Sequence, residues 1–299
     1  MDCTATPLQD IRTHDSNPAT IKISHGGVAR NIAANLASYG QQVRFLSVLS
    51  NDGFGKAMHD DLVELNIDTS KCLFRDAPSS MYLAMLDHHQ DLLMAMVDTS
   101  LLEHIQPSHI VDFLKESGPD DIIVFDTNMN ETIIATIVNN SQGTLVCDPI
   151  SITKAKKIVP HLNKIDIFKP NRLQASALSG IDIVDDRSLI EAGMFFIDQG
   201  IQDVIITLGD QGGVWIDADS IWRYESSLNK VINTVGAGDA FLAAFIAFKH
   251  QYDKMETLKI SIAAANKTCM CEDSVCKEIT LKDLLHDDMT TIKIKELQR

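Results

Sequence analysis

Short apolar runs alternate with segments of helical periodicity along this chain. Five of the runs are almost continuous in Val, Ile, Leu and Phe, which is typical of strands covered on both faces of a sheet. They cover residues 43–50, 121–127, 144–150, 165–170 and 203–209. Helical segments lie among them at 27–40, 53–66, 107–117 and 187–200. The alternation predicts an α/β fold, in which a Rossmann-like, mostly parallel sheet carries helices on both faces.

A region with a different pattern interrupts this alternation. Residues 79–98 are predicted to form two strands around a polar turn from Asp87 to Asp91, and residues 20–24 form another extended stretch. Methionines alternate through the paired stretch, and we interpret them as packing residues rather than as a binding surface. We expect a small β-lid built from about residues 7–24 and 69–98, within a single domain over residues 1–299.

The composition narrows the classes of function. The formal net charge is −15, with 45% hydrophobic and 22% charged residues, and no run of Lys and Arg provides the basic face that duplex binding requires. No apolar run reaches the roughly 18 residues of a membrane span, and the N-terminal stretch has no secretory signal. We therefore expect a cytoplasmic protein whose partners include neither nucleic acid nor membrane.

Six cysteines are scattered along the chain, and three of them lie close together at Cys269, Cys271 and Cys276. This cluster lacks the Cys-x-x-Cys spacing and the second ligand pair of a zinc site. In the absence of an export signal, reduced thiols are the expected state. We therefore predict free thiols here rather than a metal site.

The most informative motif is NTVGAGDAF, residues 233–241. It follows an extended stretch and precedes a strong helical pattern, so its glycines would lie at a helix N-terminus. There the free N–H groups and the positive end of the helix dipole attract phosphate, and glycine allows a close approach. Asp239 would repel an anion, but it suits a general base that takes a proton from a hydroxyl. The alternative is an ordinary glycine-rich turn with an aspartate in the first helical turn.

Three weaker motifs accompany this one. The stretch HGGVARN places Gly26 and Gly27 at the start of another helix, with Asn31 on its first turns. KPNRLQA covers residues 169–175, and TLGDQGG covers residues 207–213. Because ligands of α/β sheets bind beyond the carboxyl ends of strands, where three of the four motifs fall, the set predicts a ligand site.

Asp126, Asn128 and His25 are further candidates for a place in that site. The first two end a predicted strand, where an Asx turn explains them nearly as well. His25 is more simply explained as a solvated loop histidine. We therefore assign none of the three a role.

In this order and spacing, the four motifs resemble those of the ribokinase family of sugar and nucleoside kinases, the phosphofructokinase-B type. The resemblance runs from about residue 2 to about residue 275, and its GAGD element is highly specific for the family. It implies a ribokinase-like fold and the transfer of a phosphoryl group from ATP to a small-molecule alcohol. Mg²⁺ is the implied metal and K⁺ a further candidate. The lid would exclude water from the transfer.

The resemblance also implies roles for single residues. Asp239 matches the catalytic base, which acts on the 5′-hydroxyl of the sugar. The backbone N–H groups of the anion hole correspond to Gly236, Ala237 and Gly238. The ribose-binding positions correspond to Asp2, Gly26, Gly27 and Asn31. The ATP-binding positions correspond to Asn171, Thr207, Gly209 and Gly212. The Mg²⁺-phosphate region lies near Asn171 and Gln174.

Within the family, four segments most resemble the branch that phosphorylates pseudouridine: residues 15–40, 79–87, 147–151 and 169–173. This likeness implies that ATP and pseudouridine give pseudouridine 5′-phosphate and ADP. Another ribonucleoside or ribose is the alternative substrate. A non-catalytic nucleoside- or sugar-binding protein is the alternative of another class. The exposed strand edges of the lid could also pair with a second subunit to form a homodimer.

The sequence departs from the family pattern in three places. The family opens with a strand that leads into Gly-x-x-Asn-x-Asp, and Asp2 matches only the final Asp, so we expect roughly 10–20 further residues in the natural protein. Gln174 stands in place of a glutamate that organises Mg²⁺, so metal binding should be weaker. Asn233 stands where many members have an aspartate, which leaves activation by K⁺ open.

Overall fold

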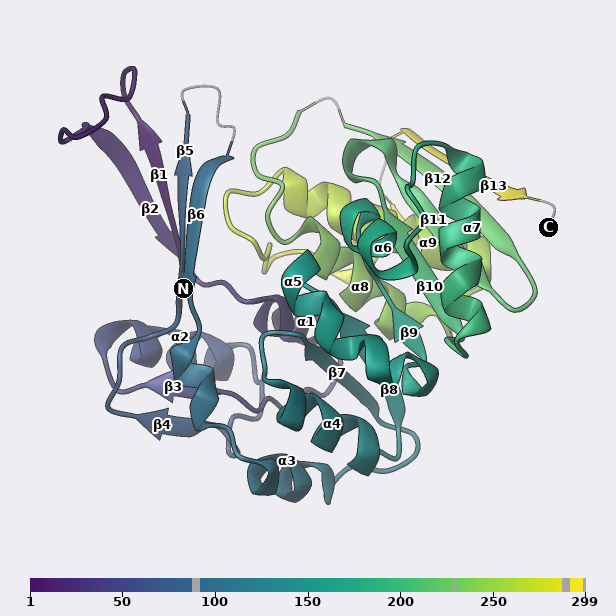
Figure 1. Cartoon of the computed structure of the whole chain (residues 1–299), viewed down its shortest axis with the longest axis horizontal. Coiled ribbons are helices and arrows are strands. Elements are labelled where there is room, and N and C mark those ends of the chain that lie inside the picture. Colours follow the sequence, from purple (N-terminus) through teal and green to yellow (C-terminus); the bar gives the residue numbers. More distant parts are fainter. Residues whose placement is uncertain (88–91, 229, 287–290, 298–299) are drawn as a thin grey trace.

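The computed structural model describes residues 1–87, 92–228, 230–286 and 291–297, so most of the turn predicted at Asp87 to Asp91 lies outside the described residues. Within them, the largest sheet has seven strands in the order β13-β12-β11-β10-β9-β8-β7 (Figure 1). Its strands are β7 (Ile122–Asp126), β8 (Thr144–Asp148), β9 (Ile167–Phe168), β10 (Asp203–Thr207), β11 (Gly213–Asp217), β12 (Ile221–Ser227) and β13 (Thr291–Leu297). Strands β7 to β10 run parallel, and β10 to β13 pair antiparallel.

Four of the five predicted strands form the parallel half of this sheet, and the predicted α/β fold is confirmed. The fifth, at 43–50, shortens to β3 (Val48–Ser50). It pairs with β4 (Leu73–Arg75) in a separate two-stranded sheet and not with the central one. An apolar run predicts a buried strand, but it does not say which sheet the strand joins.

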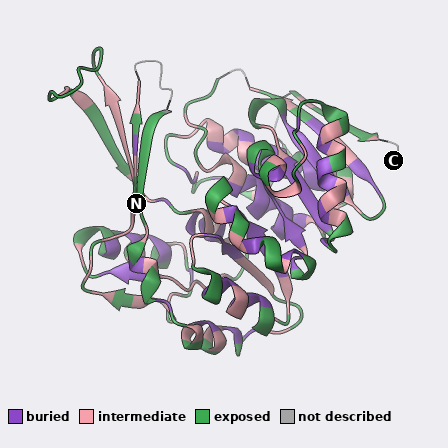
Figure 2. Ribbon diagram, in the orientation of Figure 1, coloured by how far each residue is buried: buried purple, intermediate pink, exposed green. Residues whose placement is uncertain are grey.

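Alternate side chains of the central strands enter two separate cores. On β8, Leu145 and Cys147 pack into one core, while Val146 between them packs into the other. On β10, Val204 and Ile206 enter the first core and Ile205 enters the second. Figure 2 shows the buried residues gathered in the central strands and in the helices beside them. The sheet is therefore covered on both faces, as the nearly continuous apolar runs predicted.

Each core has its own set of helices. The first core includes residues of η1 (Ser100–His104), α3 (Pro107–Leu114), α4 (Glu131–Asn140), η2 (Lys156–Lys164), α6 (Arg172–Ser179) and α7 (Asp186–Asp198). The second includes residues of α1 (Val28–Ser38), α8 (Ala237–Phe248), α9 (Lys254–Cys269) and α10 (Leu281–Leu285). The remaining helices are α2 (Gly53–Glu64), α5 (Ile152–Ala155) and η3 (Gly209–Gln211). In the described part of the chain, no helix is long and apolar enough to cross a membrane.

A four-stranded sheet projects from the body of the molecule in the order β2-β1-β5-β6 (Figure 1). Its strands are β1 (Asp2–Pro7), β2 (Ala19–Ser24), β5 (Met81–Leu86) and β6 (Leu92–Asp98). The expected lid boundaries need two corrections, because the sheet begins at Asp2 and because β4 pairs with β3 instead. The sequence pattern missed β1 because its residues, DCTATP, include few large apolar side chains.

One face of this lid sheet is apolar across all four strands. Residues opposite one another in register point to the same face of a sheet. Two such rows form this apolar lid face: Ile23, Cys3, Leu83 and Met96, then Ile21, Ala5, Met85 and Met94. Met94 and Met96 are 52% and 59% exposed. The interpretation of these methionines as packing residues is therefore wrong for the single chain.

Candidate active site

Four charged side chains meet at the carboxyl ends of the parallel strands. Asp126 ends β7 and Asp148 ends β8, and the two are register partners in adjacent strands. Lys169 follows β9, and its Nζ lies 2.8 Å from Asp148 Oδ2. Asp239 lies in the first turn of α8. Each of the four is less than one-tenth exposed, so their charges interact with little screening by water.

The start of α8 has the backbone that the glycine motif predicted. Gly236 is the N-cap residue, with a φ of 86° that favours glycine. A Cβ on Gly236 would overlap the backbone carbonyl of Ser274, so only glycine fits between the two segments. The first N–H groups of a helix have no i→i−4 partner within the helix, which suits anion binding at this helix start. Ala237 N donates to the Thr234 carbonyl oxygen at 3.4 Å, which is a long hydrogen bond.

Asp239 is held in place by Asn31 of α1. Asn31 Nδ2 donates to Asp239 Oδ2 at 2.8 Å, and both residues are buried. Burial and the nearby Asp148 carboxylate raise the pKa of Asp239 to about 7, although the hydrogen bond from Asn31 and the charge of Lys169 oppose that rise. The carboxyl therefore exchanges its proton near neutral pH, as a general base requires.

The residues expected to hold the sugar lie at the start of α1. Gly27 is the N-cap residue, with a φ of 101°. A Cβ on Gly26 would overlap the carboxylate of Asp2, so the Asp2 side chain lies directly against Gly26. Burial raises the pKa of Asp2. The lid strand β1 therefore packs, through Asp2, against the start of α1, the helix that carries Asn31.

The expected nucleotide residues form a second group. Thr207 ends β10 and forms an isolated parallel bridge with Asn171, which starts α6. In the turn that follows, Leu208 N donates to Gly212 O at 2.8 Å. Gly212 has a φ of 80°, and a Cβ there would overlap the Tyr224 carbonyl. Lys169 and Asn171 are two residues apart, so the KPN segment connects this group to the charged cluster.

The chain matches the profile of the pfkB family of carbohydrate kinases over residues 1–274. It belongs to this family. It is 33% identical over 233 residues to the pseudouridine kinase of Escherichia coli K12, an alignment that covers 77% of this chain and 74% of that protein. The membership predicted from the four motifs is therefore confirmed.

Solved structures show the same fold. A proposed sugar kinase of Clostridium perfringens superimposes with a TM-score of 0.84 at 26% identity, covering 100% of this chain and 96% of that one. A proposed ribokinase II of Escherichia coli, in complex with ATP and Mg²⁺, superimposes with a TM-score of 0.79 over 95% of each chain. At 16% identity the second likeness shows the fold alone.

Kinases of the pfkB family use ATP and Mg²⁺. The family resemblance predicts the metal region near Asn171 and Gln174. These two side chains form a capping box on α6: Asn171 Oδ1 accepts from Gln174 N at 2.9 Å, and Gln174 Oε1 accepts from Asn171 N at 2.8 Å. Mg²⁺ prefers carboxylates and phosphates, and neither side chain is a carboxylate. Across the described residues, no group of three or more His, Cys, Asp or Glu suits a metal ion. The pair does not fit a metal site built by protein alone.

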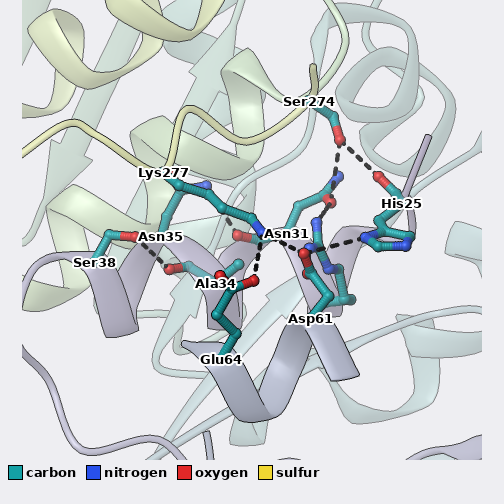
Figure 3. Close-up of polar contacts among 10 residues, drawn as sticks. His25, Asn31, Ala34, Asn35, Ser38, Asp61, Glu64, Ser274 and Lys277 are labelled. Atoms are coloured by element: carbon teal, nitrogen blue, oxygen red, sulfur yellow. Dashed lines mark hydrogen bonds and ion pairs between the residues drawn. The ribbon is translucent and has the colours of Figure 1, made fainter. Parts of the chain in front are cut away.

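A second buried aspartate, Asp61 of α2, contacts the segment from His25 to Arg30 at the start of α1 (Figure 3). It forms ion pairs with Arg30 and Lys277, and His25 Nδ1 lies 3.2 Å from its Oδ1. These neighbours hold the pKa of Asp61 below its ordinary range, against the opposing effect of burial. No local pattern predicts this cluster, because Asp61 is far from its partners along the chain. His25, expected to be a solvated loop residue, is part of it.

The segment after α9 contacts the residues at the start of α1. Ser274 Oγ lies 3.0 Å from the His25 carbonyl oxygen and 3.4 Å from Asn31 Oδ1 (Figure 3). Cys271 and Cys276 form a disulfide around it, so the prediction of free thiols is wrong for these two. The loop brings their Cα atoms to 6.0 Å, a separation that a disulfide spans. Spacing rules for metal sites gave no reason to expect this pairing.

A cavity of about 460 Å³ lies elsewhere, between β7, α1 and residues 41–47. Its lining includes Asp126 and Ala29, and Ala29 N donates to Asp126 Oδ2 at 3.3 Å. None of the residues that the family motifs assign to sugar, nucleotide or base lines it. The cavity therefore lies apart from the positions that the family motifs predict for the reactants.

Proposed function

We propose that this chain transfers a phosphoryl group from ATP to the 5′-hydroxyl of pseudouridine, giving pseudouridine 5′-phosphate and ADP. The observation that carries the proposal is Asp239, a buried carboxyl with a pKa of about 7 in the first turn of α8, where the glycine N-cap Gly236 opens the helix. A general base is most effective when its pKa is near the working pH. The 33% identity to the Escherichia coli pseudouridine kinase supports this substrate.

In the proposed reaction, ionised Asp239 accepts the proton of the 5′-hydroxyl while that oxygen attacks the γ-phosphorus of ATP. The bond to the bridging oxygen breaks, and ADP leaves with that electron pair. The N–H groups of Gly236, Ala237 and Gly238 stabilise the charge on the transferring group. Asn31 orients the carboxyl of Asp239 through the 2.8 Å hydrogen bond.

The two reactants approach from different sides of this centre. We assign the binding of the ribose hydroxyls to Asp2, Gly26, Gly27 and Asn31. Asp2 lies against Gly26, and Asn31 donates a hydrogen bond to Asp239, the proposed general base. We assign the nucleotide to Asn171, Thr207, Gly209 and Gly212, and Mg²⁺ would arrive bound to its phosphates. The lid sheet carries Asp2, so its closure would complete the ribose site and exclude water.

A competition assay tests the substrate. The protein is incubated with ATP, Mg²⁺, K⁺ and equal concentrations of pseudouridine, uridine, adenosine and ribose, and products are separated by chromatography before mass spectrometry. We expect pseudouridine 5′-phosphate to dominate. If a different compound is phosphorylated, the kinase assignment stands and the substrate is that compound.

The alternative of another class is a nucleoside- or sugar-binding protein without catalysis. The observation that favours it is Gln174, an amide engaged in a helix cap where related kinases have a carboxylate. The same assay distinguishes the two functions. Binding of a nucleoside without any ADP formation would establish the binding protein and exclude the kinase.

We also propose that the apolar lid face meets the same face of a second copy. Its two rows include no charged side chain, so two copies can meet there without burying a charge. Size-exclusion chromatography with light scattering should give a dimer, and Met94→Glu, which places a charge on a side chain that is 52% exposed, should give a monomer. A wild-type monomer at micromolar concentration would contradict this partner.

Two conditions of the reaction follow from the same assignment. Asn233 has no carboxylate, and its Nδ2 donates to the Glu272 carbonyl oxygen at 3.0 Å, so we propose that K⁺ is not required. Equal rates in potassium and tetramethylammonium chloride would support this, and a rate that depends on K⁺ would refute it. Because the reaction consumes ATP, we expect it to take place in the cytoplasm.

A further inference from the structure

Lys169 is a buried cation whose position the assigned steps do not explain. It is 6% exposed, and its backbone N donates to the Cys147 carbonyl oxygen at 3.2 Å. Its Nζ lies 2.8 Å from Asp148 Oδ2, and both side chains are more than nine-tenths buried. In the described part of the chain, Asp148 is the one carboxylate with which Lys169 forms an ion pair.

A buried ion pair of this kind is poor evidence for stability. Removing two charges from water costs several kcal/mol for each ion, and their attraction does little more than offset that cost. An apolar pair of similar volume would serve packing equally well. The position of the ammonium group is therefore better explained by what it faces.

The ammonium group faces the helix start that carries the proposed base. A Cβ on Gly238 would lie 3.2 Å from Lys169 Nζ, so the glycine leaves the cation close to the first turn of α8. The charged groups that shift the pKa of Asp239 come from three strand ends: Asp126 from β7, Asp148 from β8 and Lys169 after β9. Lys169 is the single cation among these groups.

We propose that Lys169 is a further catalytic residue, whose ammonium, held by Asp148 under Gly238, contacts the transferring phosphoryl group. Lysine acts on phosphate as a compact point charge, and its three N–H donors leave two beyond the bond to Asp148. Asp148 is the positioning residue, because it fixes the ammonium without reaching the substrate. The inference rests on the proposed kinase function, but not on the identity of the nucleoside.

The test measures ADP formation in Lys169→Met, Lys169→Arg and Asp148→Asn, with whichever pool compound the wild type phosphorylates. We expect Lys169→Met to lower kcat by about 10²-fold, the scale for losing one group that stabilises transition-state charge, with a much smaller change in KM for the alcohol. Lys169→Arg keeps the charge and should recover part of that loss.

The pH dependence of kcat/KM adds a readout that a structural role would not change. Loss of the cation in Lys169→Met should move the acid limb to higher pH, since the positive charge lowers the pKa of Asp239. Loss of the carboxylate in Asp148→Asn should move it to lower pH. Opposite shifts from the two ends of one ion pair are the signature of this arrangement.

Two further variants distinguish a loss of catalysis from a loss of folding. The double variant Asp148→Asn/Lys169→Met removes both charges, so no uncompensated ion remains buried, and it should show the same loss of kcat. Lys249→Met removes the cation from a similar buried pair, with Asp203, at the other end of α8. It should lower thermal stability and leave kcat unchanged.

The outcomes separate the two proposals. If the wild type forms no ADP with any pool compound, the kinase proposal fails first. If the wild type is active and folded Lys169→Met or the double variant keeps its kcat, Lys169 does not contact the phosphoryl group and the inference is overturned. A shifted acid limb at unchanged plateau kcat also overturns it, because Lys169 would then act on Asp239 alone.

Discussion

Two buried aspartates contact the segment from His25 to Asn31, and they have opposite surroundings. Asp239 is 8% exposed and Asp61 is 7% exposed. Around Asp239, burial and two further carboxylates raise the pKa to about 7. Around Asp61, Arg30, Lys277 and His25 hold the pKa below its ordinary range (Figure 3). Two carboxyls of similarly low exposure thus differ, because one can exchange a proton near neutral pH and the other stays ionised.

The difference has consequences for stability. A carboxyl whose pKa rises on folding destabilises the folded protein at high pH. The free energy of unfolding falls as the pH increases from the carboxyl's unfolded pKa, about 4, to its folded pKa. A carboxyl whose pKa falls contributes stability above about pH 4 and loses it as the pH drops through its folded pKa. At pH 8, Asp239 therefore weakens the fold while Asp61 strengthens it.

The substitution Asp239→Asn should have the largest effect. The rate should fall by at least about 10²-fold, since general-base catalysis is lost. Stability at pH 8 should rise by on the order of 1–3 kcal/mol, because a buried, repelled charge is removed. Steady-state kinetics and urea unfolding measure the two. Near-wild-type turnover would exclude Asp239 as the base, and a loss of stability would contradict the account of its environment.

Asp61→Asn should have the opposite effect on stability. It leaves Arg30 buried without its partner, which should cost about 3 kcal/mol at pH 7. Asp60→Asn is the matched control, because the neighbouring Asp60 side chain is 84% exposed and, among the described residues, forms an ion pair only with His59, at 3.8 Å. Thermal unfolding should show a clear decrease for Asp61→Asn and almost none for the control. Equal midpoints for the two variants would refute the anchoring role.

Ser274→Ala should have a smaller effect. The hydroxyl lies near the His25 carbonyl and Asn31 Oδ1, so its loss should cost about 1 kcal/mol and increase KM for the nucleoside a few-fold. The plateau kcat should stay within about twofold, since Asn31 still donates to Asp239. Titration of nucleoside at saturating ATP measures both constants. A fall in kcat with unchanged KM would show that Ser274 acts on the base instead.

Local patterns predicted much of this molecule. Strands β7 to β10 and the helix start at Gly236 followed from apolar runs and from the conformational needs of glycine. Family membership followed from the order of four motifs and is confirmed. These features depend on residues that are close together in the sequence, so local patterns are enough to predict them.

What the sequence did not reveal depends on distant partners. Asp61 meets Lys277, 216 residues away, and the ion pair of Lys169 with Asp148 joins two neighbouring strands. Asp148 ends a buried strand, and Lys169 opens the KPN segment, so both had a positional signal that pattern reading did not use. The lid strand β1 and the disulfide between Cys271 and Cys276 have weak local signals and arise from tertiary packing.

The most direct test of Asp239 as the base is the pH dependence of kcat/KM for the phosphorylated nucleoside in the wild-type protein. The raised pKa predicts that the rate falls tenfold per pH unit below an acid limb near pH 7, because the protonated carboxyl cannot accept the proton of the hydroxyl. An acid limb near pH 4, the value of an ordinary aspartate, would contradict the account, because the reacting carboxyl would then lack the buried, repelled environment of Asp239.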